Sequence, residues 1–313
     1  MFCAKMLFFC VIGSMATFQK THGIFLLDKD SGMTSNRALQ MVKKIYNAKK
    51  AGHTGCLDPL ASGMLPICLG EATKIASYLL SADKCYIVTG CLGITTTTGD
   101  SEGEETSRMS DVAISLEAFT QTLASFQGSM TQIPPMYSAL KHQGRPLYHW
   151  ARRGIEIERE PRSVSIQSMQ LLHFEIPFFT AELTVSKGTY LRTWVEDLGK
   201  ALGVGAYVTQ LRRRFVSPYC DNSMISLETL QALSPLEQCA RLVPPASALP
   251  HLPEILLNAR ETLALRYGQT VHISNPEQTG LVRLHEPDHA FFGIGEIDAC
   301  GTLISKRLVS FAS

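Results

Sequence analysis

Apolar and polar residues follow two distinct periods along this chain, one typical of strands and one typical of helices. The apolar run 23–29 predicts a strand, and Thr34 or Ser35 then precedes apolar residues spaced three and four positions apart, which predicts a capped helix. Alternating or continuous apolar runs predict further strands at 64–69, 84–93, 163–176 and 179–186. Helical spacing predicts further helices at 71–80, 116–126, 145–153 and 189–202.

Other segments follow neither period. The polar residues 95–105 predict a loop, and Pro134 with Pro135 excludes a helix from 132–141. The proline-rich stretch 242–253 is typical of a linker. Short alternating strands are expected beyond it at 282–284, 290–296 and 302–308. Because helices lie between groups of strands without regular alternation, we expect an α+β fold with a mainly antiparallel central sheet flanked by helices.

Length and charge limit the organisation and the partners. With 313 residues and 45% hydrophobic content, the chain is long and apolar enough for one large domain and one small domain. We expect a leader or tail at 1–22, a large domain at 23–248 and a small β-rich domain at 249–313. The net charge is only +1, so a nucleic-acid partner has to be held by local basic clusters. Four such clusters, each of which also suits an ordinary solvated surface, lie at 43–50, 141–145, 152–153 and 212–214.

The cysteines and the N-terminal segment bear on the compartment. The nine cysteines show neither a disulfide framework nor a zinc-site spacing, which favours reduced thiols in the cytoplasm. The N-terminus favours export instead, because Lys5 precedes the apolar run 7–11 and Ser14–Ala16 resembles a cleavage site. That run is too short to span a membrane. A start at Met15 removes the conflict, so we expect a cytoplasmic protein in which 1–14 is an over-extended start or a tail.

The stretch 52–66 concentrates three glycines and two prolines around a single carboxylate, Asp58. Glycine allows backbone angles closed to other residues and proline fixes φ, so a rigid, non-helical loop between two regular elements is expected. Such a loop can hold one carboxylate still against a ligand. An aspartate before a proline also commonly caps a turn, and spacing alone favours neither interpretation. Cys56 also lies in this stretch, but a catalytic thiol would need a partner base in addition, so we interpret it as a packing residue.

The sequence GHTGCLDPLASGMLP resembles the catalytic motif of the TruB family of RNA pseudouridine synthases, in which the aspartate is the nucleophile. Five further segments resemble that family in the same order, so the resemblance covers about 23–216. They are Gly70–Lys74, Lys84–Tyr86, Pro134–Lys141, Lys187–Arg192 and Leu211–Arg213. The resemblance implies the pseudouridine synthase fold with a PUA-like RNA-binding C-terminal domain. It also implies isomerisation of the T-loop uridine of tRNA, position 55, without cofactor or metal.

Uridine isomerisation breaks the N1–C1′ bond, turns the base and rejoins it through C5, which needs a nucleophile but no redox cofactor. A buried carboxylate without a partner is driven toward its neutral form, so a cation is needed beside it. The resemblance assigns that role to Arg192. It implies that Tyr86 and Tyr190 hold the flipped base and relay a proton. It also implies that His53 contacts or enters the RNA loop and that Leu211 lines the base pocket.

The chain departs from the family pattern in two loops. Asp30 stands where the family has proline, and the usual Arg and Asp of the family's RTDTxDxxG loop are replaced within 95–100. Asp100 and Gly103 of that loop remain. These departures affect loop contacts rather than the expected nucleophile. The C-terminal domain is similar to the family only in length and strand pattern.

Two other functions compete with this interpretation. A tRNA-binding folding chaperone in which catalysis is secondary would be favoured by loss of Asp58, which is present. An exported hydrolase needs a second carboxylate or a metal cluster, and the motif supplies neither. Guide-RNA-dependent relatives share the motif but typically carry a fuller C-terminal domain. We therefore expect a stand-alone monomer that binds the T-arm of tRNA and requires no protein partner. Attack at C6, attack at C1′ and a glycal route all stay open.

Overall fold

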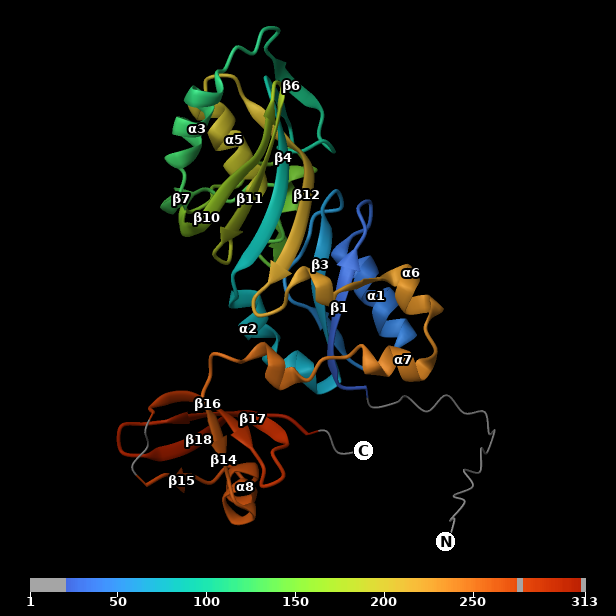
Figure 1. The fold of residues 1–313 in the computed structure, drawn as a ribbon, viewed down its shortest axis with the longest axis vertical. Helices are drawn as coiled ribbons and strands as arrows, with labels where there is room; N and C mark the ends of the chain where they lie inside the picture. The colour runs from blue at the N-terminus through green and yellow to red at the C-terminus, as the bar shows by residue number, and fades with distance from the viewer. Residues whose placement is uncertain (1–20, 275–277, 311–313) are drawn as a thin grey trace, which may run out of the picture.

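The larger part of the protein is a long sheet, seen in a computed structural model that describes residues 21–274 and 278–310 (Figure 1). Within these residues the sheet has nine strands in the order β13-β1-β3-β12-β4-β11-β10-β7, with β2 beside β3. Their bounds are β13 (Ile225–Ser226), β1 (Gly23–Lys29), β3 (Ser62–Leu69), β12 (Ala206–Val216), β4 (Lys84–Leu92), β11 (Phe178–Val185), β10 (Arg162–Glu175), β7 (Gly128–Gln132) and β2 (Ala51–His53). Only β1 with β13 and β3 with β12 pair in parallel among these described strands, which confirms a mainly antiparallel sheet.

Most of the helices lie beside this sheet (Figure 1). The helices are α1 (Ser35–Ile45), α2 (Ala76–Ser81), α3 (Leu116–Ala124), α4 (Leu147–Ala151), α5 (Leu191–Ala201), α6 (Leu227–Ala232) and α7 (Pro235–Ala240). The expected cap of α1 is confirmed, since the Thr34 side chain accepts a hydrogen bond from the Arg37 N–H. Gly203, with φ +75°, follows the C-cap residue Leu202 of α5, where a left-handed backbone favours glycine. In the described part of the chain, no helix is both long and apolar enough to cross a membrane.

Several expected boundaries were wrong in detail. The helix expected at 71–80 begins with a 3-10 segment, Gly70–Ile75, before α2. The loop expected at 95–105 contains the start of a hairpin, β5 (Ile94–Thr96) with β6 (Glu105–Arg108), because β-branched threonines favour pairing despite their polarity. The helix expected at 145–153 is only α4, which follows a small hairpin. That hairpin pairs β8 (Lys141–His142) with β9 (Arg145–Pro146).

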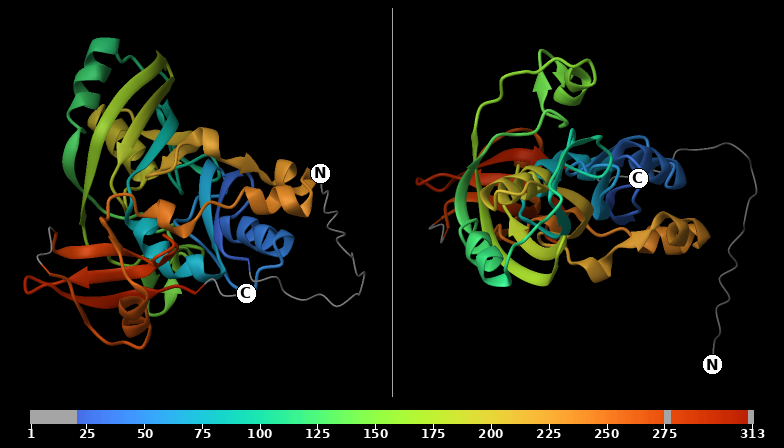
Figure 2. Two further views of the ribbon diagram at one scale, coloured as in Figure 1. Left: turned by 60° about the horizontal axis from the view of Figure 1, so that its bottom comes forward. Right: turned by 90° about the horizontal axis from the view of Figure 1, so that it is seen from above.

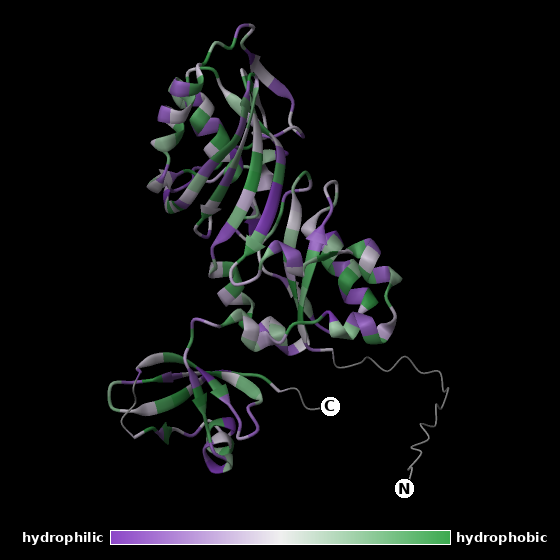
Figure 3. Cartoon of the chain, in the orientation of Figure 1, coloured by the Kyte–Doolittle hydropathy of each residue, from purple (hydrophilic) through white to green (hydrophobic). Residues whose placement is uncertain are grey.

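A second sheet forms the C-terminal part, with strand order β14-β16-β17-β18-β15. Its strands are β14 (Glu254–Leu256), β16 (Gly280–His285), β17 (Phe291–Ile297), β18 (Thr302–Leu308) and β15 (Val271–His272), with helix α8 (Ala259–Arg266). Three of these strands confirm the expected ones, whereas β14, β15 and α8 were not predicted. Figure 3 shows apolar residues along β1 and along this C-terminal sheet.

The two sheets share a core, so the proline-rich stretch 242–253 is packed rather than a free linker. Val243 pairs with Ile24 through both backbone groups, at 2.9 Å each. Leu249 is buried in one cluster with Ile24 of β1 and Ile294 of β17. Apolar side chains between the prolines explain this, because they gain free energy by leaving water. The left view of Figure 2 shows the C-terminal sheet against the base of the larger part.

Gly63 lets β3 and β12 approach each other, and this gives a stability prediction. Its φ is +97°, and a Cβ there would lie 2.2 Å from the Arg213 carbonyl oxygen. Gly128 has the same φ but nothing within 4 Å of its Cβ position. Both Gly→Ala changes therefore strain the backbone, but only Gly63→Ala adds a clash with backbone atoms. We expect Gly63→Ala to cost about 2 kcal/mol more than Gly128→Ala in denaturant unfolding. Equal losses from the two variants would contradict this account.

Candidate active site

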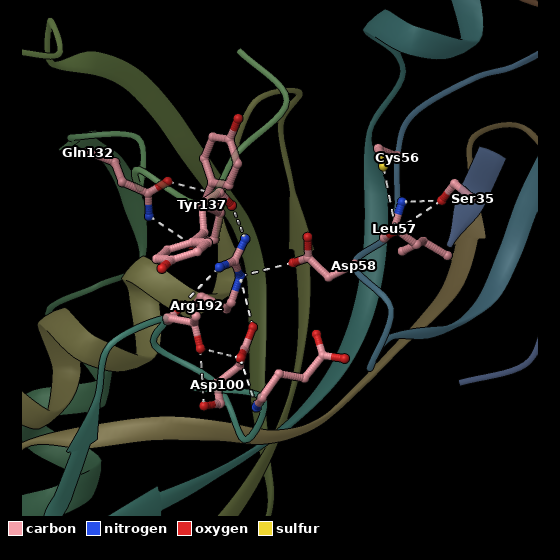
Figure 4. A network of polar contacts seen from close by, with 11 residues as sticks. Ser35, Cys56, Leu57, Asp58, Asp100, Gln132, Tyr137 and Arg192 are labelled. Atoms are coloured by element: carbon pink, nitrogen blue, oxygen red, sulfur yellow. Dashed lines mark hydrogen bonds and ion pairs between the residues drawn. The ribbon is translucent and has the colours of Figure 1, made fainter. Parts of the chain in front are cut away.

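Asp58 lies in a loop between β2 and β3 that is tied to its surroundings on both sides. The Ser35 hydroxyl accepts a hydrogen bond from the Leu57 N–H at 2.8 Å and donates one to the Leu57 carbonyl at 2.9 Å (Figure 4). The Pro59 carbonyl accepts a hydrogen bond from the Gly32 N–H at 2.7 Å. The rigid, non-helical loop expected around Asp58 is therefore present, and it leaves the carboxylate as the group that projects from it.

The Asp58 carboxylate pairs with Arg192, the residue to which the family resemblance assigned this contact. Arg192 Nε lies 2.9 Å from Asp58 Oδ2. Arg192 sits in the first turn of α5, where it donates to the Thr98 carbonyl at 2.9 Å and to the Tyr137 carbonyl at 2.6 Å (Figure 4). Its side chain is only 4% exposed, so these contacts are shielded from solvent. The guanidinium is therefore fixed from several directions, and it orients the carboxylate in turn.

Asp100 is a second carboxylate on the same guanidinium, which the sequence interpretation did not assign to the site. Its Oδ2 lies 3.5 Å from Arg192 Nε, and its side chain is buried. The Thr98 hydroxyl and the Glu102 N–H donate to its Oδ1. The sequence did contain one indication of this role, because Asp100 is kept in a loop, 95–100, whose other family residues are replaced. Two carboxylates therefore share one guanidinium.

Burial raises the pKa of the Asp58 carboxyl above its ordinary value. The charge and hydrogen bond of Arg192 oppose this rise, whereas the nearby charge of Asp100 adds to it. The Asp58 side chain is still 35% exposed, so a ligand can reach it. A carboxylate that is oriented, reachable and less acidic than a surface aspartate suits nucleophilic or acid–base chemistry.

Asp58 lines a cavity of about 340 Å³ together with four other residues that the sequence selected. Tyr86 comes from β4, Tyr190 precedes α5, Leu211 comes from β12, and Arg192 completes the set. Burial raises the pKa of the Tyr190 hydroxyl. The fold thus brings five of the six predicted site residues to one cavity, with two aromatic rings and one aliphatic side chain around a carboxylate.

The backbone of Tyr190 is held by a side chain that the sequence did not single out. Gln132, buried at the end of β7, accepts a hydrogen bond from the Tyr190 N–H at 2.7 Å and donates one to its carbonyl at 3.0 Å (Figure 4). This paired amide contact resembles a strand pairing and fixes the segment just before Arg192.

His53, the sixth predicted site residue, is not among the residues that line this cavity. It lies on β2, paired with Ile67 of β3, and is partly buried. Burial, together with the charge of Arg213, lowers the pKa of its imidazole. Its Nδ1 is buried without a hydrogen-bond partner within the described residues. The expected contact of His53 with RNA stays a prediction.

Two buried lysines lie near the site, and the sequence analysis did not single them out. The Lys29 ammonium donates to the carbonyls of Asp30 and Met33, and burial lowers its pKa to about 8. The Lys84 ammonium donates to two carbonyls in the last turn of α2 and to the Ala82 carbonyl just after it, and burial lowers its pKa to about 8 as well. Both therefore hold backbone around the site rather than presenting charge to a ligand.

The predicted basic cluster 212–214 is not a free phosphate-binding patch. Arg212 forms two hydrogen bonds with the Asp28 carboxylate, at 3.0 and 2.8 Å. Arg214 pairs with Glu182 and Asp221, and Arg213 is buried. Alternation along β12 explains the split, because neighbouring side chains point to opposite faces of a sheet. Figure 3 shows the hydrophilic stretch of β12.

Two other basic clusters, 141–145 and 152–153, are exposed, because they lie on an arm that extends from the sheet. In the view from above, the segment that carries β8, β9 and α4 stands away from the rest of the molecule (Figure 2). Lys141, Arg145, Arg152 and Arg153 are exposed on it. The Arg152 guanidinium stacks 5.5 Å from the centre of the Tyr148 ring. Exposed guanidinium and ammonium groups of this kind can contact phosphate.

Other cavities lack this chemistry. One of about 550 Å³ lies between α2 and the proline-rich stretch, and another of about 580 Å³ lies beside β12. The latter contains Arg212, which is already paired with Asp28. Within residues 21–274 and 278–310, no cluster of three or more His, Cys, Asp or Glu side chains is arranged to hold a metal ion.

Comparisons with known proteins agree along the chain. The family profile "TruB family pseudouridylate synthase (N terminal domain)" matches residues 43–191. The profile "tRNA pseudouridylate synthase B C-terminal domain" matches 192–249, and "Pseudouridine synthase II TruB, C-terminal" matches 253–309. The fold is similar to a crystal structure of a Cbf5-Nop10-Gar1 complex, with a TM-score of 0.70 and 24% identity, covering 93% of this chain and 84% of that one.

Curated relatives are more similar in sequence. A protein of Aeromonas salmonicida (strain A449) named tRNA pseudouridine synthase B is 49% identical over 301 residues, which cover 93% of this chain and 94% of the relative. A protein of the same name from Pasteurella multocida (strain Pm70) is 46% identical over 293 residues, 92% of this chain and 95% of the relative.

Proposed function

The chain belongs to the TruB family of pseudouridylate synthases, and on that premise we propose that it isomerises the T-loop uridine of tRNA, position 55, to pseudouridine. The observation that carries this proposal is the Asp58–Arg192 pair at the wall of a cavity that also contains Tyr86 and Tyr190. The curated relatives named tRNA pseudouridine synthase B match nearly the whole chain, which supports tRNA as the substrate.

Asp58 is the proposed nucleophile. The reaction breaks the N1–C1′ bond and forms a C5–C1′ bond, while C5 loses a proton and N1 gains one, so no electrons are exchanged with a cofactor. Each of the three routes, through C6, through C1′ or through a glycal, needs one ionised carboxylate beside the sugar and base. Arg192 favours that ionised form and holds its orientation.

Tyr86, Tyr190 and Leu211 are proposed to hold the flipped base in the cavity that they line. A uridine stacked in a folded loop costs about a few kcal/mol to extrude, and stacking on an aromatic ring recovers part of that cost. A tyrosine hydroxyl beside the base can relay the proton that leaves C5. His53 is proposed to contact the RNA loop outside this cavity.

The T-arm of the tRNA is proposed to lie along the exposed arm that carries Lys141, Arg145, Arg152 and Arg153. With a net charge of +1, the protein has no overall field for RNA, so these side chains have to supply the local attraction. Residues 23–248 are proposed as the catalytic domain and 249–313 as the PUA-like RNA-binding domain. The expected leader or tail at 1–22 lies outside the described residues except for its last two. The protein is proposed to act as a monomer in the cytoplasm without a protein partner.

Pseudouridine mapping on unmodified tRNA tests this function. Carbodiimide forms a stable adduct with pseudouridine that stops primer extension, and we expect one stop, at the T-loop uridine, after incubation with purified protein. A stop at another uridine would overturn the position. Tight tRNA binding without any stop would instead favour the folding-chaperone alternative.

The pH dependence of the rate follows from the pKa of Asp58. The nucleophile has to be ionised, so the rate falls as the pH drops through the pKa of Asp58, which burial raises above its ordinary value. Asp100→Asn removes a nearby like charge, so this pKa should fall and the acid limb should move to lower pH. Single-turnover rates are measured between about pH 4 and about pH 8 for the wild type and for Asp100→Asn. Each pH–rate profile is normalised to its own maximal rate, so that the pH at half-maximal rate on the acid side can be compared. A limb that stays in place or moves to higher pH would argue against a charge effect of Asp100 on Asp58.

A further inference from the structure

Arg213 is a buried cation on β12 that the proposed chemistry does not use. It is 1% exposed, whereas its neighbours Arg212 and Arg214 are partly exposed and pair with carboxylates. Among the described residues, Arg213 forms no salt bridge. Taking a guanidinium out of water without a carboxylate costs several kcal/mol, so its hydrogen bonds have to compensate. Their acceptors therefore indicate what the group is for.

The acceptors of Arg213 lie on both sides of Asp58. Its Nη2 donates to the Gly55 carbonyl at 3.1 Å, and its Nε donates to the Met64 carbonyl at 2.6 Å. Gly55 precedes Asp58 by three positions and Met64 follows it by six. One planar group thus spans the two ends of the loop that carries the proposed nucleophile, and it also lines the cavity.

The third contact of Arg213 reaches the aromatic residue proposed to hold the base. Its Nη1 lies 3.5 Å from the Tyr86 hydroxyl, and Arg213 pairs directly with Tyr86 across β12 and β4. Directly paired residues project to the same face of a sheet. On its other side, Arg213 pairs with Gly63 of β3, where the lack of a Cβ allows the close approach. Arg213 therefore connects β3, β4 and the Asp58 loop.

We propose that Arg213 is a positioning residue that fixes the Asp58 loop and the Tyr86 hydroxyl relative to each other. This inference rests on the proposed function and adds a residue to it. The planar fork of guanidinium donors can reach all three acceptors at once, and the compact ammonium of lysine cannot reproduce that geometry. The charge of Arg213 also reaches the surrounding groups, since it lowers the pKa values of His53, Lys84 and Lys29 after the larger effect of burial.

Arg213→Lys and Arg213→Met test the proposal, with Arg214→Lys as the matched control. Arg214 lies on the same strand, but it is ion-paired and does not line the cavity. At saturating protein, we expect Arg213→Lys to lower the single-turnover rate about 100-fold, the size of effect that a misplaced reacting group produces. Its affinity for tRNA should stay within about twofold of wild type, because Arg213 is buried. Arg214→Lys should keep the wild-type rate.

A double-mutant cycle with Tyr86→Phe separates positioning from general support of the fold. If Arg213 acts through Tyr86, the two losses should be less than multiplicative in the double variant. Melting curves show whether each variant is folded at the assay temperature; if Arg213→Met is not, Arg213→Lys carries the test because it keeps the charge. A wild-type rate for Arg213→Lys, strictly multiplicative losses, or a loss of tRNA affinity that accounts for the whole effect would overturn the proposal. Failure of the wild-type protein to modify tRNA would instead overturn the proposed function.

Discussion

Asp58→Asn is expected to lower the rate of pseudouridine formation by about 1,000-fold or more while tRNA binding stays close to wild type. The amide keeps the volume of the carboxyl group but cannot act as a nucleophile or stabilise an adjacent cationic centre. Arg192 retains Asp100 as a counter-charge, and Asp58 is itself a carboxylate whose ionised form is disfavoured by burial. The substitution should therefore remove chemistry without removing the fold.

Single-turnover pseudouridine mapping measures this loss, and filter binding at one fixed salt concentration measures tRNA affinity. Asp111→Asn is the matched control, because Asp111 is exposed and has the same chemical change. It should leave both the rate and the affinity unchanged. A rate for Asp58→Asn within about tenfold of wild type would remove Asp58 from the role of nucleophile.

Substitution of Arg192, the cation that pairs with Asp58, is also expected to lower the rate strongly. Arg192→Lys should lower the single-turnover rate by about 100-fold, because an ammonium cannot hold Asp58, Asp100 and two carbonyls from fixed directions. Arg192→Gln removes the charge as well, which leaves the two carboxylates near each other without the guanidinium between them. The pKa of Asp58 should then rise further, so the acid limb of the pH–rate profile should move to higher pH, opposite to the shift expected for Asp100→Asn.

The control for these variants is Lys200→Gln, an exposed position on the same helix. It tests whether loss of a positive charge on α5 matters in general. Arg192→Gln also disturbs a buried network, so its melting temperature has to be measured alongside the rate. If the pH–rate profiles of Arg192→Gln and wild type coincide at the acid side, Arg192 does not set the ionisation of Asp58.

Local patterns were sufficient to predict five of the nine described strands of the larger sheet and a rigid loop around Asp58. The run 23–29 became β1 because a continuous apolar segment forms a buried strand, and glycine and proline around Asp58 left only a loop there. The resemblance to the family then selected Arg192, Tyr86, Tyr190 and Leu211, and all four lie at the cavity with Asp58.

The strand β12 was missed, and with it the place of Arg213. Three consecutive arginines obscure the alternation that marks a strand, so the pattern suggested a basic surface patch instead. In the fold, Arg212 and Arg214 pair with carboxylates on one face of the sheet, and Arg213 is buried on the opposite face. Local sequence patterns do not show which carboxylates pair with these arginines, because Glu182 is 32 positions away from Arg214 in the chain.

The sequence by itself indicated Asp58 as the candidate nucleophile, the α+β class, and the family to which the chain belongs, since each rests on short motifs and local patterns. Only the tertiary structure decided which groups surround Asp58. Arg192, Asp100 and Arg213 come from α5, from the loop after β5 and from β12, and they meet because the sheet brings these elements together. Charge, burial and distance act through space, so the pKa of Asp58 and the clamp around its loop follow from packing rather than from sequence order.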